Sequence, residues 1–355
     1  MEIAIITDTH AGIRNDAQVF LDVQDKFYRD VFFPEIDRRN IKHVLHLGDY
    51  FDRRKFINFN TLSCNHKSFI QPLIERELEL TVIIGNHDTT FKNTNTPNSP
   101  TQLLSWVPKI RIIHEHPQEI TIGQTRIGLV PWICDENREH ITRYLERNSA
   151  PDIIMGHFEI AGFEMFKGQV CEHGLSRDFF SKFDLVLSGH FHHKSTIGNI
   201  TYLGSPHQAT WADYDDPRGF HIFDTNTLGL EFIENTDHVF IKFSYDDTNM
   251  TLDEVVNEDF SYCKDRFVRV LIEKKNDPAL FEKVIQRIQQ ENPADLSLVE
   301  DYNILRDTSD DAGIDMGKET IGIVEDYIQD LSVENKDKLK AYFKSLYLES
   351  AELIV

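Results

Sequence analysis

The sequence Ile3-Ala4-Ile5-Ile6-Thr7-Asp8-Thr9-His10 lies near the start of the chain and decides its fold class. A run of apolar residues is followed directly by an acidic residue and a histidine. A short, unbroken apolar run is typical of a strand that is buried on both faces, as in a parallel sheet covered by helices. We therefore predict a strand over residues 2–7, with Asp8 and His10 at its carboxyl end.

Four later segments repeat this arrangement of an apolar run followed by polar donors. The five motifs are Asp8-Thr9-His10, Gly48-Asp49-Tyr50-Phe51-Asp52, Gly85-Asn86-His87-Asp88, Gly156-His157 and Gly189-His190-Phe191-His192. We expect the four glycines to let the backbone turn sharply and bring the donors toward one centre. Each motif alone is weak evidence, but the ordered set at strand ends indicates a functional cluster.

The donors in these motifs are imidazoles, carboxylates and an amide oxygen. This mixture suits divalent Mn, Fe or Zn better than a metal that prefers thiolates. There are enough donors for two ions, with one carboxylate left to bridge them. Two ions roughly 3.5–4 Å apart can activate a hydroxide and hold the oxygens of a phosphate during in-line displacement.

Strand-like and helix-like runs alternate over the first 225 or so residues. The predicted strands are residues 2–7, 43–47, 80–84, 126–130, 152–155, 185–188, 200–203 and 219–223. Helical spacing of apolar residues predicts helices over residues 18–39 and 60–76. The pattern predicts an α/β fold, a β-sandwich flanked by helices, with its site where the strands end.

The sequence pattern changes after residue 236, which suggests a domain boundary. We predict that residues 1–236 form the main domain and residues 237–306 a small α/β cap domain, with a strand at 267–272 and a helix at 278–290. Residues 307–320 are acidic and read as a linker. Residues 321–355 form a helical tail, whose apolar spacing over 321–348 suggests two short helices that need another surface to cover them.

The composition sets limits on the class of protein. Of the 355 residues, 40% are hydrophobic and 27% are charged, as in ordinary globular proteins, and no run approaches the roughly 18 apolar residues of a membrane span. The four cysteines have no paired spacing, which favours a reducing compartment, the cytoplasm. The net charge of −22 opposes simple nucleic-acid binding unless bound cations or a basic partner supply positive charge.

The five motifs resemble those of the calcineurin-like metallophosphoesterase superfamily. The resemblance implies one ion held by Asp8, His10, Asp49 and His192, and a second held by Asp49, Asn86, His157 and His190. It further implies that His87 is the catalytic histidine, stabilising the transition state and protonating the leaving oxygen, and that Asp88 orients His87. Asp52 stands where many relatives carry histidine. We leave it outside the catalytic set and expect it to bond nearby backbone, Arg53 or Arg54.

Within this superfamily the chain looks like the SbcD-type nucleases of double-strand-break repair, and especially the phage members of that branch. The segments Tyr202-Leu203-Gly204-Ser205-Pro206 and Pro217-Arg218-Gly219-Phe220 are similar to theirs, as is the tail. The resemblance implies a Mn-dependent exonuclease on duplex ends and endonuclease on single strands. It also implies a homodimer, formed through helices of the first 70 residues, and an SbcC-type ABC ATPase bound by residues 321–348.

Several residues near the motifs have ordinary structural interpretations beside functional ones. The basic run Arg53, Arg54 and Lys55 is either a solvated surface or a contact to DNA phosphate. We expect His43 and His46 to be structural, His193 and His207 to face solvent, and Trp132 and Trp211 to be packing residues. For the whole chain, the alternatives are a phosphatase or small phosphodiesterase, or a scaffold without catalysis.

Overall fold

The computed structural model describes residues 1–166 and 169–300, together with the isolated positions 328, 336, 339, 340 and 343. The described residues between 1 and 300 belong to one compact unit. The linker and most of the partner-binding tail, predicted at 307–320 and 321–355, lie outside the described residues. None of the described helices combines the length and apolar character that crossing a bilayer requires.

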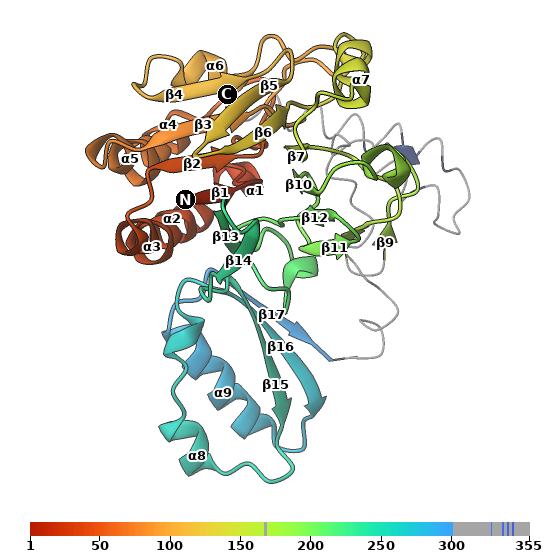
Figure 1. Cartoon of the computed structure of the whole chain (residues 1–355). Helices are drawn as coiled ribbons and strands as arrows, with labels where there is room; N and C mark the ends of the chain where they lie inside the picture. The colour runs from red at the N-terminus through yellow and green to blue at the C-terminus, as the bar shows by residue number, and fades with distance from the viewer. Residues whose placement is uncertain (167–168, 301–327, 329–335, 337–338, 341–342, 344–355) are drawn as a thin grey trace. The chain divides into compact units, whose positions relative to one another are not determined.

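Two six-stranded sheets form the body of the molecule (Figure 1). The first has the order β14 (Gly229–Glu234), β13 (Gly219–Asp224), β1 (Glu2–Ile6), β2 (His43–His46), β3 (Glu79–Ile83), β4 (Ile110–Ile113). The second has the order β11 (Ser195–Ile197), β12 (Ile200–Tyr202), β10 (Leu185–Gly189), β7 (Ile153–His157), β6 (Thr125–Val130), β5 (Gln118–Ile122). All eight predicted strands are confirmed, with ends shifted by at most two residues.

Both sheets have parallel strands at their centre and antiparallel strands at an edge. In the first sheet β1, β2, β3 and β4 pair in parallel, while β13 pairs with β1 antiparallel. In the second, β6, β7, β10 and β12 are parallel, and β5 and β11 are antiparallel. The carboxyl ends of the central strands therefore meet at one edge of each sheet.

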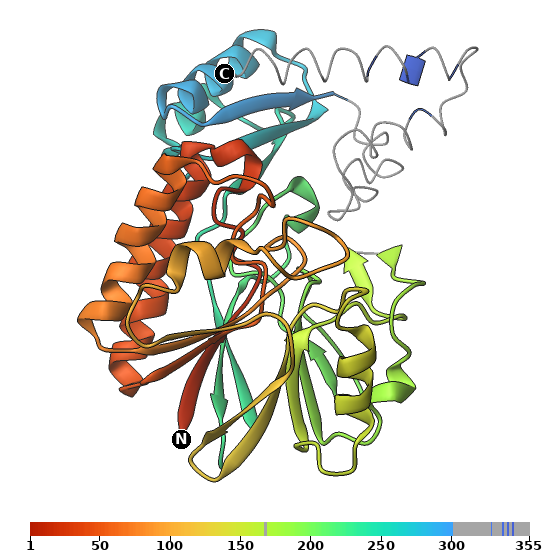
Figure 2. The same ribbon diagram turned by 90° about the horizontal axis from the view of Figure 1, so that it is seen from above.

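Helices cover the outer faces of the two sheets, so the predicted β-sandwich flanked by helices is confirmed. Over the first sheet lie α2 (Gln18–Phe27), α3 (Phe33–Arg39), α4 (Phe59–Asn65) and α5 (Gln71–Glu75), which Figure 2 shows in red to orange along one flank. Over the second lies α7 (Arg138–Glu146). Apolar residues of both sheets, such as Ile5, Leu45 and Met155, fill the space between them.

The two predicted helices each contain a π-helical turn that the sequence pattern did not reveal. The π-helical segment Tyr28–Phe32 separates α2 from α3, and His66–Ile70 separates α4 from α5. A π-helical turn shifts the side chains that follow it around the helix axis. Phe32 and Phe69 lie within these two segments, and both are buried in the core beneath the helices.

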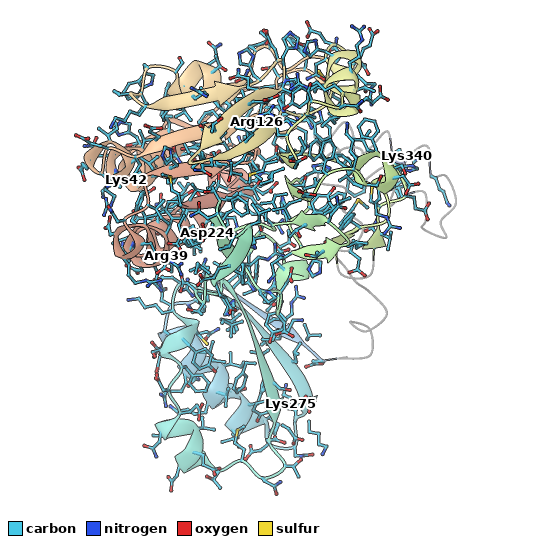
Figure 3. The ribbon with its side chains drawn as sticks, viewed as in Figure 1. Arg39, Lys42, Arg126, Asp224, Lys275 and Lys340 are labelled. Atoms are coloured by element: carbon cyan, nitrogen blue, oxygen red, sulfur yellow. The ribbon has the colours of Figure 1, made fainter. Side chains whose placement is uncertain are left out.

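Ion pairs connect α3 to the first sheet, and another connects the start of the chain to β13. Arg39, labelled in Figure 3 at the end of α3, donates to Glu2 of β1 at 2.8 Å and to Glu231 of β14 at 2.7 Å. The amino group of Met1 lies 3.1 Å from Asp224 of β13. Because most of these groups are partly exposed, each pair adds little to stability.

Shorter elements complete this part of the chain. They are α1 (Ile13–Asp16), α6 (Ser99–Leu104), β8 (Glu164–Phe166), β9 (Gln169–Val170) and 3₁₀ turns at Arg177–Phe180 and Trp211–Asp213.

A separate three-stranded sheet follows β14. Its elements are β15 (Phe240–Asp246), α8 (Leu252–Asn257), a 3₁₀ turn at Ser261–Cys263, β16 (Phe267–Lys274), α9 (Pro278–Gln290) and β17 (Asp295–Val299). The strands are parallel, and α9 buries Phe281 and Val284 against them. The arrangement agrees with the α/β character expected of the cap, although its exact limits, 237–306, stay a prediction.

Candidate metal centre

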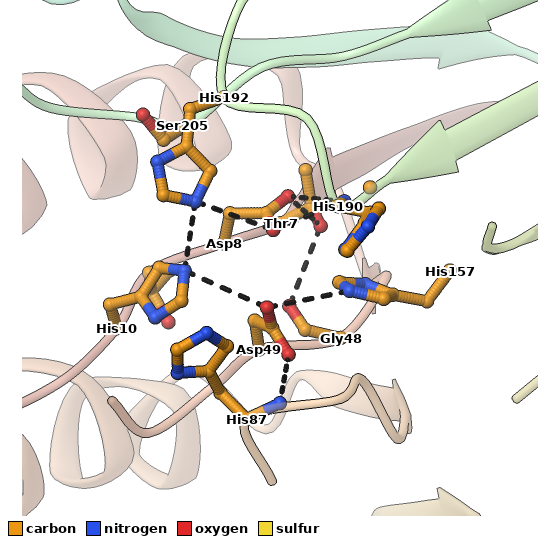
Figure 4. Close-up of polar contacts among 12 residues, drawn as sticks. Thr7, Asp8, His10, Gly48, Asp49, His87, His157, His190, His192 and Ser205 are labelled. Atoms are coloured by element: carbon orange, nitrogen blue, oxygen red, sulfur yellow. Dashed lines mark hydrogen bonds and ion pairs between the residues drawn. The ribbon is translucent and has the colours of Figure 1, made fainter. Parts of the chain in front are cut away.

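All the predicted metal ligands lie at the carboxyl ends of parallel strands. Asp8 and His10 follow β1, Asp49 follows β2, and Asn86 follows β3; His157 ends β7, and His190 and His192 follow β10. The first four come from one sheet and the last three from the other. Figure 4 shows six of these side chains converging from the two sheets on one small volume.

The first group of donors consists of Asp8, His10 and His192, whose ligand atoms lie within 4.8 Å of one another. Nε2 of His10 is 2.9 Å from Nε2 of His192, and the latter is 3.9 Å from Oδ1 of Asp8. The three side chains are buried, with at most 6% exposed. Two imidazole nitrogens and a carboxylate that face each other in this way match the donors of a divalent transition-metal ion.

The second group consists of Asn86, His157 and His190 together with Asp49. Oδ1 of Asn86 is 3.0 Å from Nε2 of His157 and 2.9 Å from Nδ1 of His190. Nδ1 of His157 lies 2.8 Å from the carbonyl oxygen of Leu47. Because that carbonyl can only accept a hydrogen bond, Nδ1 donates to it, and Nε2 is the nitrogen that faces the site.

Asp49 lies between the two groups. Its Oδ2 atom is 3.7 Å from Nε2 of His10 and 3.4 Å from Nε2 of His157, while its Oδ1 accepts from the backbone N–H of His87 at 2.7 Å. One carboxylate oxygen thus faces imidazoles of both groups. This is the position of a bridging ligand, and the donor set fits two divalent ions.

The charges of the buried site perturb the pKa values of its members. Burial raises the pKa of Asp8, and the neighbouring charge of Asp49 raises it further. Burial opposes the charged form of Asp49 too, but the charges of His157 and His87 outweigh it and hold the pKa of Asp49 well below its usual value.

The imidazoles of His10 and His157 have raised pKa values. Burial disfavours protonation of His10 and His157, yet the carboxylates around them raise the pKa of each to about 9. The main contributors are Asp52 and Asp49 for His10, and Asp49 for His157. A site that draws protons onto buried imidazoles carries excess negative charge, and the same field attracts metal cations.

Several ligand residues adopt backbone conformations that are unusual for residues other than glycine. Asp8, His10, Asp49 and His190 have φ angles of 51°, 43°, 54° and 93°. Each such conformation costs on the order of 1–3 kcal/mol, and residues of this kind concentrate at functional sites. Backbone hydrogen bonds of 3.0 Å, from Asp8 to Gly48 and from His10 to Asp49, hold two of them in place.

The glycines of the motifs act mainly by allowing close approach. Of the four, only Gly48 has a positive φ, at 100°, so the expectation that all four supply a sharp turn was wrong. A Cβ on Gly85 would lie 2.2 Å from Oδ1 of Asp49, and one on Gly189 would lie 2.1 Å from Oγ1 of Thr7. Glycine is required there because the ligand loops press against each other.

His87 and Asp88 lie beside the metal ligands but make different contacts from those predicted. The carboxylate of Asp88 accepts from the backbone N–H groups of Tyr50, Phe51 and Gly85 at 2.9–3.2 Å. Nδ1 of His87 lies 2.8 Å from the carbonyl oxygen of Asp52. Asp88 therefore joins the loops that carry Asp49 and Asn86, while the backbone of Asp52 orients His87. Burial lowers the pKa of His87, and the charge of His10 lowers it further.

Asp52 belongs to the site more directly than expected. Its carboxylate lies 3.4 Å from Nδ1 of His10, so the prediction that it bonds Arg53 or Arg54 is not what the structure shows. Arg53 instead donates to Asn15 at 2.9 Å and pairs with Asp16 at 3.3 Å. A phosphate contact by Arg53, Arg54 or Lys55 stays a prediction.

Two of the neighbouring histidines differ from expectation. His207 is buried and bonded to Gln24 at 3.1 Å, and His193 is half-buried and 2.9 Å from Asp216, so neither faces solvent freely. His46 is buried and its Nε2 lies 2.9 Å from Oγ1 of Thr9, while Nδ1 of His43 lies 3.2 Å from Glu79; both contacts agree with the structural roles expected. The indole of Trp211 packs on Phe240, as predicted.

Residues with no clear signal in the sequence also support the ligands. Glu159 lies 3.6 Å from Nε2 of His190, the nitrogen that faces away from Asn86. Buried Arg218 donates to the carbonyl oxygen of His192 and to Ser205, and pairs with Asp213 and Asp216 at 2.7 Å. Arg218 lies in the segment Pro217-Arg218-Gly219-Phe220, so the family resemblance could have identified it as a functional residue. No sequence signal identified Glu159.

This fold and donor set define a metallophosphoesterase, an enzyme that uses divalent metals to hydrolyse phosphate esters. Residues 1–194 match the calcineurin-like phosphoesterase family, and the chain belongs to that family. The superfamily and fold class predicted from the motifs are both confirmed.

The relationship to phage proteins is also confirmed. The chain is 30% identical over 360 residues to exonuclease subunit 1 of Enterobacteria phage T4, an alignment that covers 99% of this chain and 100% of that protein.

Solved structures show weaker likeness. A purple acid phosphatase from yellow lupin is 16% identical to this chain, with a TM-score of 0.39. The alignment covers 66% of this chain and 49% of the phosphatase chain. An archaeal phosphodiesterase has 13% identity and a TM-score of 0.33 and covers 66% of this chain and 100% of its own. Scores this low support no conclusion about substrate.

Proposed function

We propose that this protein is a metal-dependent DNA phosphodiesterase, acting as an exonuclease on duplex ends and an endonuclease on single strands. The proposal rests chiefly on Asp49 Oδ2, which faces the imidazoles of both donor groups beside His87. The nuclease assignment draws on the full-length similarity to a phage exonuclease subunit. The donor set suits divalent Mn, Fe or Zn, and the resemblance to SbcD-type nucleases favours Mn²⁺ among these.

Asp8, His10, Asp49 and His192 would hold one ion, and Asp49, Asn86, His157 and His190 the other. When bound, such ions activate a water nucleophile and neutralise the phosphate. The protein holds the imidazole ring of His87 in a fixed orientation, because its Nδ1–H donates a hydrogen bond to the backbone carbonyl oxygen of Asp52. With Nδ1 engaged, the opposite nitrogen of His87 is the atom that would donate a proton to the leaving oxygen.

The test compares wild type with His87→Ala on a labelled linear duplex and on a single-stranded circle, with Mn²⁺ present. We expect the variant to bind Mn²⁺ normally and to lose at least about 100-fold in kcat, the range of general acid catalysis. The exposed His116→Ala is the matched control. If wild type hydrolyses only phosphomonoesters the enzyme is a phosphatase, and if it binds metal but cuts nothing it is a scaffold.

We further propose that two copies associate through α4 and the loop after α6. A cavity of about 310 Å³ there is lined by apolar residues including Leu62, Ile70 and Trp106. Phe59 is 87% and Trp106 63% exposed, which is unusual for large apolar side chains in a monomer. An exposed apolar patch of this kind suits the twofold interface of a homodimer. Phe59→Asp should yield monomers in sedimentation, whereas Leu252→Asp in α8 should not; an unchanged dimer would refute this surface.

A positively charged partner would explain how a chain of net charge −22 acts on DNA. We propose that residues 321–348 bind an SbcC-type ABC ATPase. Truncation after Asp311 should abolish retention of that ATPase in a pull-down while leaving Mn²⁺ binding intact. Retention by the truncated chain would disprove this role of the tail.

A further inference from the structure

A cavity adjoins the second donor group, because His157 forms part of its wall. It has a volume of about 330 Å³, and its lining includes Trp132, Ile133, Arg138, His157, Glu159 and Leu175. Volumes of about 300–1,000 Å³ are typical of small-molecule sites, so this space suits one nucleoside and not a duplex. We call it the Trp132 cavity. Because His157 belongs to both places, a group in the cavity would lie next to the reacting phosphate.

Trp132 is held firmly at the wall of this cavity. Its backbone N–H donates to Ile84 at 2.8 Å, and its carbonyl accepts from the side chains of Asn95 and Asn137 at 2.8 and 2.9 Å. Both asparagines are buried. The indole centroid lies 5.2 Å from the ring of His190 and 5.9 Å from that of His157. An aromatic ring fixed in this way offers a contact surface at little entropic cost.

The chemistry of the other walls points to a nucleotide. Ile133 and Leu175 are apolar, while the carboxylate of Glu159 is partly exposed. Arg138, at the start of α7, is exposed, and within residues 1–166 and 169–300 no carboxylate forms an ion pair with it. The nearby Arg143 and Arg147 are paired with Glu139 and Glu119. A flat aromatic surface beside an unpaired guanidinium is the combination that binds a base and its phosphate.

We propose that the Trp132 cavity binds the base of the nucleotide that flanks the cleaved phosphodiester. Trp132 stacks on this base, and Arg138 contacts the next phosphate along the strand. The inference rests on the proposed nuclease function. It assigns Trp132 a role beyond packing, and it requires the terminal or flanking base to leave its stack, which is easiest in single strands and at frayed ends.

The first test is binding and does not depend on DNA cleavage. Calorimetry on the Mn²⁺-loaded full-length protein compares a deoxynucleoside 5′-monophosphate with deoxyribose 5-phosphate, which lacks the base. We expect about tenfold tighter binding of the nucleotide by wild type, within the range for one stacked base. Trp132→Ala should remove this preference and Trp132→Phe should retain most of it. Equal Mn²⁺ affinity of the three proteins excludes damage to His157 and His190.

Both of these ligands carry one phosphate and lack the next phosphate along the strand, so Arg138→Ala should bind them like wild type. It should bind a dinucleotide that carries the second phosphate more weakly than wild type, because the variant lacks the guanidinium that contacts that phosphate. The control is Arg143→Ala, one turn further along α7. A wild type that binds the two ligands equally, or a Trp132→Ala variant that keeps the preference, would overturn the proposal.

Cleavage then separates this inference from the nuclease assignment. With a single-stranded oligonucleotide, Trp132→Ala should raise KM about tenfold and leave kcat nearly unchanged. With an abasic residue beside the scissile phosphate, wild type and variant should share that raised KM. Normal cutting without these KM effects disproves the base site alone. A base preference in binding without DNA cleavage disproves only the nuclease function, and indicates a phosphodiesterase for smaller nucleotides.

Discussion

Oδ1 of Asp52 lies 3.4 Å from Nδ1 of His10, on the side of the ring opposite His192. The contact orients the imidazole so that Nε2 faces the metal ligands, and it contributes to the raised pKa of His10. Carboxylates that hold a ligating histidine in this way strengthen metal binding. Asp52 also orients His87, but through its backbone carbonyl.

Asp52→Asn separates these two contacts, because it changes the carboxylate and keeps the carbonyl. We expect Mn²⁺ affinity to fall by about 10–100-fold, as for other residues that support metal ligands. At saturating Mn²⁺, kcat should stay close to wild type. Calorimetric titration of Mn²⁺ measures the first effect, with the exposed Asp215→Asn as the control. Unchanged affinity with a large loss of kcat would instead place the carboxylate in the chemistry.

The structure brings the residues predicted as metal ligands together, but several contacts around them differ from those predicted. Asp8, Asp49 and His190 follow apolar strands, and topology alone brings parallel strand ends together. The contacts of Asp88 and Asp52 depend on the relative rotation of neighbouring loops, which no local pattern encodes. The edge strands β4 and β5 were missed because they are only partly buried, so their apolar pattern is weak.

Asp88→Asn should destabilise the fold. The carboxylate accepts three backbone N–H groups, and an amide in its place would turn its NH₂ group toward at least one of these donors. A buried donor without an acceptor costs about 1–3 kcal/mol. Urea unfolding of the metal-free protein at neutral pH measures this loss. The exposed Asp253→Asn in α8 should unfold like wild type, and an equally stable Asp88→Asn would show that the loops do not need the carboxylate.

Gly85→Ala should abolish metal binding with little loss of secondary structure. The added Cβ would lie 2.2 Å from Oδ1 and 2.4 Å from the backbone nitrogen of Asp49, so Asp49 must move. Gly198→Ala is the matched control, since its Cβ would meet nothing within 4 Å although its φ is +62°. The control should lose about 1 kcal/mol of stability and keep its Mn²⁺. Normal Mn²⁺ binding by Gly85→Ala would mean that the loop carrying Asp49 can move to make room for the added Cβ without losing the metal site.

Acid should destabilise the protein partly through His221 of β13. Burial lowers the pKa of this imidazole to about 3, and the charge of Lys194 adds to the effect. An unfolded histidine has a pKa of about 6.5, so below that pH the unfolded chain takes up a proton that the folded chain does not. The stability that neutral His221 contributes is therefore complete above pH 6.5 and is lost as the pH falls toward 3.

Between pH 7.5 and 5 the loss of unfolding free energy should amount to about 2 kcal/mol. His221→Phe should show a decrease in unfolding free energy smaller by that amount, measured with urea in the presence of a chelator, whereas the exposed His238→Phe should follow wild type. Identical pH dependence for wild type and His221→Phe would mean that the buried imidazole takes up its proton in the folded state.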